Sequence, residues 1–319
     1  MTEHFVTLFD YKFLPQGLAL HASLVEHCED FVLWILCLDS QVERKLKELS
    51  LINVRLLSLA SLETSELAAV CQTRTKAEYC WTLTPWSVQW VFDAEPGVNR
   101  VTYIDADMYF FDSPNKILRD FIRSQKSVFI TEHNYSPEND QSSLSGRYCV
   151  QFVSFIRDGG QVVLSWWRDR CMEWCFNRYE NNLFGDQRYL EHFEEVLPGQ
   201  IYSLGSDPRF QAPWNSSRFC HSDVVVYHFH GLRLMGENCC LLTDYNLPQV
   251  VLSSLYRPYL RRLREVSSLY SVDIPFQATQ VNRAEQFLLW LRKKIAYKLF
   301  RLQFPPFFAV KEGASFSIW

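Results

Sequence analysis

Two aspartates separated by one residue, Asp105 and Asp107, have the types and spacing of ligands for a divalent cation. The pair stands between the apolar runs Val101–Ile104 and Met108–Phe111. A bare Asp-x-Asp is more often a solvated turn, but charges placed between apolar runs need a partner. Carboxylate oxygens suit Mg²⁺ or Mn²⁺, and such an ion neutralises a diphosphate. The pair therefore predicts a metal site that handles a phosphorylated substrate.

An α/β sheet is predicted to position this pair. Short apolar runs alternate with helical patterns in the first half of the chain, at residues 5–9, 31–38, 54–57 and 100–104. This βα rhythm is typical of parallel strands covered on both faces. Further strands are expected near 127–130, 152–156 and 224–227. Asp10, Asp39 and Asp105 each follow a predicted strand, so we expect them at the sheet edge where ligands bind.

Composition restricts the class of protein. The chain has 319 residues and a formal net charge of -4, which lacks the positive charge of a general nucleic-acid binder, so no nucleic acid is expected as a partner. Its ten cysteines do not show the spacing of a structural zinc site, and the start lacks the pattern of an export signal. We therefore expect buried, reduced thiols and a cytoplasmic protein. No apolar run is long enough to span a bilayer.

The segment Arg100–Phe111 resembles the metal-binding strand of the GT-A glycosyltransferases, most closely family 8 and its bacterial relatives. Three further stretches match in order. Thr7–Asp10 is similar to the strand and turn that hold the nucleotide base, Gly185–Gln187 to an Asp-Gln motif before a helix, and Tyr227–Gly231 to a late His-x-x-Gly motif. The resemblance covers roughly residues 5–235 and implies a Rossmann-like GT-A fold with a mixed, mainly parallel sheet.

By this resemblance, His228 rather than His230 completes the metal site with Asp105 and Asp107. Neutral imidazole suits Mn²⁺ better than Mg²⁺, so Mn²⁺ is the expected cofactor and Mg²⁺ the alternative. A histidine in an apolar strand is also commonly a core residue with its hydrogen bonds satisfied. If the strand continues, His230 lies on the opposite face, where we expect it to contact phosphate or acceptor.

The resemblance also implies the reacting end of the site. Asp186 would hydrogen-bond the acceptor sugar, and Gln187 would lie beneath the anomeric carbon. An ordinary helix N-cap at Asp186 is an equal interpretation, and both can hold together. The family's retaining outcome needs stabilisation of a diphosphate leaving group more than a strong protein base.

Contacts to the donor are expected on the same grounds. Thr7 and Asp10 would hold the nucleotide base. Related enzymes place a cation near the sugar or phosphate in the region before the fourth strand, and Arg74 and Lys76 are the cations available there. A solvated helix start explains the same two residues equally well.

The acceptor side carries one match and one departure. Pro213–Asn215 resembles a loop that lines the acceptor, so Trp214 and Asn215 are candidate contacts, although a packed loop tryptophan is at least as common. Cys149 and Gln151 stand where relatives show an asparagine and a glycine, which puts the sugar contact of that asparagine in doubt.

After about residue 245 the pattern becomes helical. We expect a catalytic domain at 1–245 and a helical C-terminal region at 246–319. Residues 285–302 form a basic amphipathic pattern. That pattern suits either peripheral contact with the inner face of the cytoplasmic membrane or packing against the catalytic domain.

These features predict a metal-dependent, retaining glycosyltransferase of the hexosyltransferase type. It would move a sugar from a nucleotide-diphosphate donor, UDP by resemblance, to a saccharide or lipid-linked saccharide in bacterial polysaccharide biosynthesis. A sugar-nucleotide-forming nucleotidyltransferase is the first alternative, and the lack of a Gly-rich signature after the first strand disfavours it. A non-catalytic nucleotide-sugar-binding protein is the second, in which Cys149 and Gln151 mark a decayed site.

Overall fold

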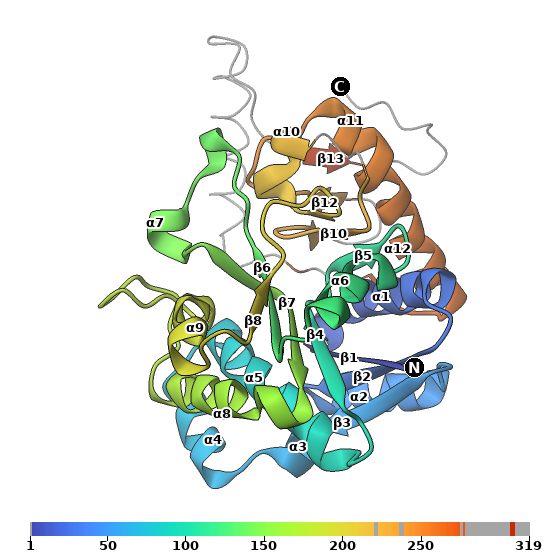
Figure 1. The fold of residues 1–319 in the computed structure, drawn as a ribbon. Coiled ribbons are helices and arrows are strands. Elements are labelled where there is room, and N and C mark those ends of the chain that lie inside the picture. The colour runs from blue at the N-terminus through green and yellow to red at the C-terminus, as the bar shows by residue number, and fades with distance from the viewer. Residues whose placement is uncertain (1, 220–222, 236–238, 275–276, 278–306, 310–319) are drawn as a thin grey trace.

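A computed structural model describes residues 2–219, 223–235, 239–274, 277 and 307–309. At its centre is a seven-stranded sheet with the order β3-β2-β1-β4-β7-β6-β8 (Figure 1). In chain order its strands are β1 (Glu3–Phe9), β2 (Phe31–Cys37), β3 (Val54–Ser58), β4 (Arg100–Ile104), β6 (Val128–Glu132), β7 (Tyr148–Ile156) and β8 (Ile201–Ser203).

The sheet is mixed and mainly parallel, as the sequence predicts. Strands β1 to β4 are parallel to one another, β8 is parallel to β6, and β7 runs antiparallel to its neighbours β4 and β6. Side chains of β1 are buried on both faces, which explains the continuous apolar runs. Phe5 and Phe9 join one core cluster, while Val6 and Leu8 join the other.

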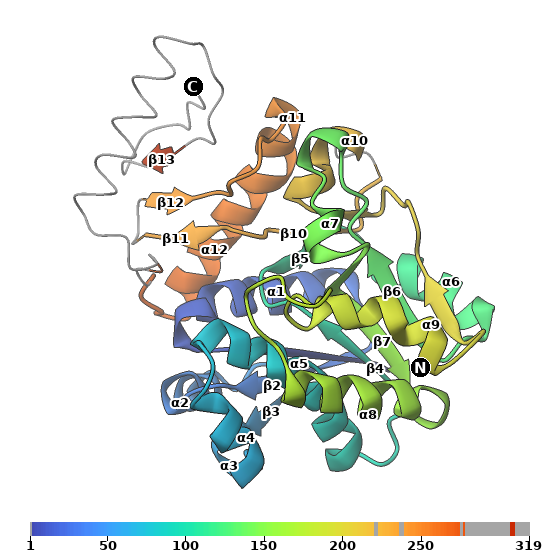
Figure 2. The same ribbon diagram turned by 90° about the vertical axis from the view of Figure 1, so that its left-hand side faces the viewer.

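Helices cover both faces of the sheet. Helices α5 and α8 pack side by side on the face of Val6 and Leu8, while α1, α6 and α12 contribute to the cluster on the opposite face (Figure 2). Within the described residues the α-helices are α1 (Leu14–His27), α2 (Ser40–Leu49), α3 (Leu59–Leu62), α4 (Ser65–Cys71), α5 (Lys76–Ala94), α6 (Asn115–Ser124), α7 (Ser142–Ser145), α8 (Arg157–Glu173), α9 (Phe193–Val196), α10 (Ser216–Phe219), α11 (Gln249–Val251) and α12 (Arg257–Leu269).

Short helical turns join several of these elements. Four are 3-10 helices, η1 (Tyr11–Phe13), η2 (Pro137–Asn139), η3 (Gln187–His192) and η4 (Pro213–Asn215). A fifth, η5 (Leu252–Tyr256), is a π-helix between α11 and α12.

Two small sheets lie beside the main one. The first has the order β5-β10-β9 and is formed by β5 (Met108–Phe110), β10 (Val226–His228) and β9 (Phe210–Gln211). The second has the order β11-β12-β13, from β11 (Arg233–Leu234), β12 (Cys239–Leu241) and β13 (Phe307–Ala309). Within the first, β10 runs antiparallel to β5 with His228 opposite Met108. This register brings the C-terminal end of β10 to the turn that follows β4.

The described part of the C-terminal region packs on the rest of the chain. Helix α12 lies along α1, and its Tyr259 and Leu263 share a core cluster with Phe5 of β1. The division near residue 245 stays a prediction. The predicted basic helix at 285–302 lies outside the described residues. Among those that are described, no helix is long and apolar enough to cross a membrane, and the eight cysteines whose side chains are described are free thiols.

One close approach fixes how α1 lies against the end of β1. A Cβ added to Gly17 of α1 would come within 2.4 Å of the buried Phe9 ring. We expect Gly17→Ala to lower the free energy of unfolding by about 1–3 kcal/mol through overpacking. This outweighs a gain in helix propensity of at most about 1 kcal/mol.

Urea denaturation measures this effect, with Gly97→Ala as the matched control. Gly97 is exposed, and its added Cβ would lie 3.8 Å from the nearest atom outside its chain neighbours, in ordinary contact. The control should stay within about 0.5 kcal/mol of the wild type. A Gly17→Ala protein as stable as the control would contradict the tight contact.

Candidate active site

Three side chains from separate elements meet at one edge of the sheet. Asp105 follows β4, Asp107 precedes β5, and His228 ends β10. His228 Nε2 lies 3.0 Å from Asp107 Oδ1 and 3.6 Å from Asp105 Oδ2. One ligand atom from each residue falls within 4.8 Å of the other two. Of the described residues, these form the group of His, Cys, Asp or Glu that could hold a metal ion.

Backbone hydrogen bonds hold this cluster together. The amide of Met108 donates to the carbonyl of Asp105 at 3.2 Å, which closes a tight turn around the two aspartates. The amide of Phe229 donates to the carbonyl of Asp107 at 2.9 Å and continues the pairing of β10 with β5. Main-chain hydrogen bonds therefore fix where these candidate ligands lie.

The three side chains of the cluster shift one another's pKa values. Burial by itself lowers the pKa of His228, but Asp107 outweighs burial, and the pKa lies above its ordinary value. Burial raises the pKa of Asp105, with His228 opposing the shift. The pKa of Asp107 is lowered because His228 outweighs its burial. A divalent cation fits this donor set, since one imidazole nitrogen and two carboxylates converge on it.

The second nitrogen of the His228 ring has its own partner. His228 Nδ1 lies 2.6 Å from Gln151 Oε1, and both side chains are buried. The backbone carbonyl of Gln151 also accepts a hydrogen bond from the amide of Asp105, at 3.1 Å. The sequence marked Gln151 only as a departure from the family pattern.

A cavity of about 320 Å³ opens beside this cluster. Asp105 and His228 line it together with Asp186, Gln187 and His230. His230 is exposed there, while the neighbouring His228 is buried. The remaining walls are largely aromatic, from Trp81, Tyr103, Tyr135, Phe184, Trp214 and Tyr245. The predicted metal site and reacting end thus face one space.

Asp186 occupies an unusual environment in this cavity. Its side chain is 5% exposed, and its Oδ2 atom has no hydrogen-bond partner among the described residues. Burial, reinforced by the charge of Asp105, raises the pKa of Asp186 to about 8. Asp186 also stands at the N-cap position of η3 but makes no side-chain capping hydrogen bond. The N-cap interpretation therefore does not account for its carboxyl group.

The two acceptor-side candidates differ in what they present. Trp214 lines the cavity, and its ring meets those of His228 and His230 edge-on, with centroids 5.5 and 5.4 Å away. Asn215 is buried, and both its amide atoms bind backbone. Its oxygen accepts from Ala212 at 2.9 Å, and its nitrogen donates to the carbonyl of His133 at 3.0 Å. Asn215 therefore fixes the loop that positions Trp214.

Two of the four donor-side candidates lie at a second cavity of about 470 Å³. Arg74 and Lys76 line it. Lys76 forms an ion pair with Asp10, and Arg74 donates to Thr82 Oγ1 and to a backbone carbonyl. Thr7 is fully buried within β1 and lines neither cavity. Thr7, Asp10, Arg74 and Lys76 therefore stay predictions as substrate contacts.

Helix α5 contributes to both cavities. Lys76 at its start, with Tyr79 and Cys80, lines the larger cavity, and Trp81 and Thr84 line the smaller one beside Asp105. A capping box fixes the start of this helix, because Thr75 and Glu78 bind each other's backbone amides.

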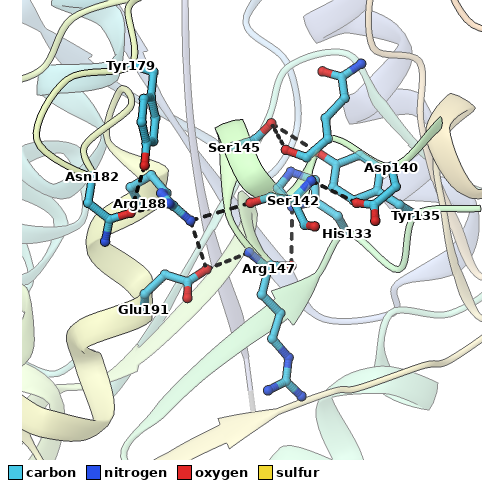
Figure 3. A network of polar contacts seen from close by, with 11 residues as sticks. His133, Tyr135, Asp140, Ser142, Ser145, Arg147, Tyr179, Asn182, Arg188 and Glu191 are labelled. Carbon is cyan, nitrogen blue, oxygen red and sulfur yellow. Dashed lines mark hydrogen bonds and ion pairs between the residues drawn. The ribbon is translucent and has the colours of Figure 1, made fainter. Parts of the chain in front are cut away.

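A polar network holds the segment that covers one side of the cavity. Figure 3 shows Arg188 and Glu191 of η3 reaching toward α7 and Arg147. Glu191 Oε1 accepts from the amide of Arg147 at 2.5 Å, and Arg188 Nη1 lies 3.5 Å from the carbonyl of Ser142. Gly146 is required between them, because an added Cβ would lie 2.7 Å from Glu191 Oε1.

Comparison with known proteins supplies a family. No protein-family model matches the chain. The uncharacterized protein YfnF of Bacillus subtilis is 32% identical over 255 residues, which cover 75% of this chain and 84% of YfnF. This chain belongs to the YfnF family. A second Bacillus subtilis protein, the uncharacterized YfnD, is 28% identical to this chain over 287 residues, which cover 82% of this chain and 89% of YfnD.

Solved structures that resemble this YfnF-family fold are glycosyltransferases. Mouse xyloside xylosyltransferase 1 matches with a TM-score of 0.47 and 12% identity, over 72% of this chain and 98% of that protein. The galactosyltransferase LgtC, solved with donor and acceptor sugar analogs, matches with a TM-score of 0.48 and 13% identity, over 89% and 99% of the two chains.

The raised pKa of Asp186 predicts a pH-dependent stability. Between about pH 4 and pH 8 the folded protein binds a proton at Asp186 that the unfolded chain has lost, so the free energy of unfolding falls as pH rises. Asp186→Asn removes this dependence. In thermal melts from pH 5 to pH 9, the free energy of unfolding of the variant should rise relative to that of the wild type. The rise should be up to about 1.4 kcal/mol per pH unit and should stop near pH 8. Parallel pH profiles would contradict the assignment.

The network at η3 predicts a local effect on the covering segment. Glu191→Ala removes the acceptor of the Arg147 amide, and the loss of one hydrogen bond should speed amide exchange there by about tenfold. Glu195→Ala is the matched control, because Glu195 is a nearby exposed carboxylate whose partner is His192. Hydrogen exchange followed by mass spectrometry over residues 140–148 measures the difference. Equal exchange in the two variants would refute the proposed tether.

Proposed function

We propose that this chain is a metal-dependent GT-A glycosyltransferase that moves a sugar from a nucleotide-diphosphate donor to a saccharide acceptor. The observation that carries the proposal is the meeting of Asp105, Asp107 and His228 at the wall of a cavity that also holds Asp186. A cluster that could hold a cation, beside a cavity with aromatic walls, supports this chemistry better than either feature alone.

The charges of the cavity support metal dependence. None of the described residues that line the smaller cavity is a lysine or an arginine. Two of them, Asp105 and Asp186, carry carboxyl groups. A diphosphate placed here without a cation would face carboxylates with no compensating positive charge. Asp105, Asp107 and His228 would hold Mn²⁺, or Mg²⁺ as the alternative. When bound, the ion supplies charge neutralisation to the diphosphate as it leaves.

The polar groups opposite the metal ligands suit a sugar. Asp186 is held protonated at neutral pH by its burial and the charge of Asp105, so its carboxyl group can donate to a sugar hydroxyl as well as accept from one. Trp81 and Trp214 offer flat apolar surfaces of the kind that pack on sugar faces. Gln187 lines the same cavity beside Asp186, and by the resemblance it would lie beneath the anomeric carbon.

The finer assignments rest on the sequence resemblance. They are a UDP-sugar donor, a retaining outcome, and a saccharide or lipid-linked acceptor in polysaccharide biosynthesis. The larger cavity, with Arg74 and Lys76 on its wall and Asp10 bound to Lys76, would take the nucleotide side of the donor. His230, exposed at the smaller cavity, would contact phosphate or acceptor.

A thermal-shift screen tests the proposal. A UDP-sugar with Mn²⁺, at one hundred times its dissociation constant, should stabilise the wild type by about 2.7 kcal/mol, a shift of about 5 °C. Asp107→Ala should lose most of this shift, because a ligand of the cation is gone. Asp169→Ala, which removes an exposed carboxylate on α8, should respond as the wild type does.

The product of the reaction separates the candidate activities. Incubation with UDP-sugars, Mn²⁺ and saccharide acceptors should release UDP. Pyrophosphate formed from UTP and a sugar phosphate would instead favour a nucleotidyltransferase, and binding without turnover on any acceptor would favour a nucleotide-sugar-binding protein. No shift of the wild type with any nucleotide sugar would end the proposal.

A further inference from the structure

Each nitrogen of the His228 ring faces a different kind of group. Nε2 points at the carboxylates of Asp105 and Asp107, and Nδ1 faces the side-chain oxygen of Gln151 at 2.6 Å. His228 is 4% exposed and Gln151 is 1% exposed, so water does not compete for this contact. The short, buried hydrogen bond sets the orientation of the imidazole ring.

The chemistry of an amide oxygen decides which nitrogen carries the hydrogen. Such an oxygen only accepts hydrogen bonds, so Nδ1 must donate. In the neutral ring, the lone pair then lies on Nε2, where a cation held between the two carboxylates can accept it. The opposite tautomer would set the lone pair of Nδ1 against the oxygen of Gln151 and turn an N–H bond toward the cation site. Gln151 therefore disfavours the form of His228 that cannot bind a cation through Nε2.

Gln151 also holds the strand that carries the first ligand. It lies in β7, which pairs with β4, and its backbone carbonyl accepts the hydrogen of the Asp105 amide at 3.1 Å. Gln151 thus binds the end of β4 with its main chain and the end of β10 with its side chain, and so links the two. The amide nitrogen of Gln151 has no partner among the described residues, so His228 provides the side-chain hydrogen bond that orients this amide.

We propose that Gln151 is the positioning residue of the cation site, fixing the tautomer and orientation of His228 and tying that ligand to Asp105. This inference rests on the metal site of the proposed function. It also gives a use to a residue that departs from the pattern of the resembling family. On this account, glutamine at position 151 builds the site and does not mark its decay.

Mn²⁺ binding without nucleotide or acceptor tests the proposal, with free Mn²⁺ followed by electron paramagnetic resonance. Gln151→Met keeps the length of the side chain but removes the acceptor, so we expect Mn²⁺ to bind about 10- to 100-fold more weakly. Gln151→Glu keeps an acceptor against Nδ1 and should bind Mn²⁺ as tightly as the wild type or more tightly. Cys149→Ala, a change in the same strand and the same cavity, should leave the affinity unchanged.

Two outcomes of this titration would overturn the proposal. One is equal Mn²⁺ affinity in Gln151→Met and the wild type. The other is equal loss in Gln151→Met and Gln151→Glu, because rescue by an acceptor is what a positioning role requires and a packing role does not. Thermal melts of each variant without metal report whether it is folded.

A second measurement separates this inference from the proposed function. If the wild type binds no Mn²⁺, the metal site of the proposed function fails. The tautomer of His228 is then read from ¹⁵N spectra of histidine-labelled wild type at a pH where the ring is neutral. A hydrogen on Nδ1 supports the role of Gln151, and a hydrogen on Nε2 refutes it. This readout needs neither a metal nor a variant.

Discussion

Strand β10 lies antiparallel to β5, with His228 opposite Met108 and the amide of Phe229 bonded to the carbonyl of Asp107. This pairing joins a late segment of the chain to the turn after β4, and every feature of the site depends on it. Aromatic packing behind the strand supports it. The Phe229 ring stacks on Tyr259 of α12, with centroids 3.7 Å apart. Helix α12 therefore contributes to the site without touching the cavity, because it holds β10 in register.

Electrical balance is the second constraint on the site. Two carboxylates, an imidazole and a third, protonated carboxyl group share a partly buried region whose described cavity lining holds no basic side chain other than histidine. Asp107 and His228 shift each other's pKa in the direction of an ion pair, the carboxyl group downward and the imidazole upward. A divalent cation would provide more charge to the same atoms. The arrangement therefore offers a divalent cation two carboxylates and an imidazole at close range.

The sequence predicts the parts of this structure that depend on local order. Apolar runs gave the strands of the sheet, and the Asp105–Asp107 spacing with the motif at His228 gave a cluster that the structure brings together. The contact of Gln151 with His228 could not be predicted in this way, because it joins β7 to β10 across space. For the same reason, nothing in the spacing reveals that the backbone already satisfies Asn215. The burial of Thr7 also follows from its place in the middle of β1, which a motif match does not weigh.

Helix α5 forms part of the wall of both cavities, and this has a consequence for ligand length. Its rise from Lys76 to Thr84 is about 12 Å, and the capping box fixes where that rise begins. A ligand that occupies both spaces must therefore bridge a span set by a rigid rod and not by a loop. One inserted residue near Tyr79 would rotate the walls relative to each other by about 100°. A ligand that reached both cavities would therefore be matched in length to this one helix.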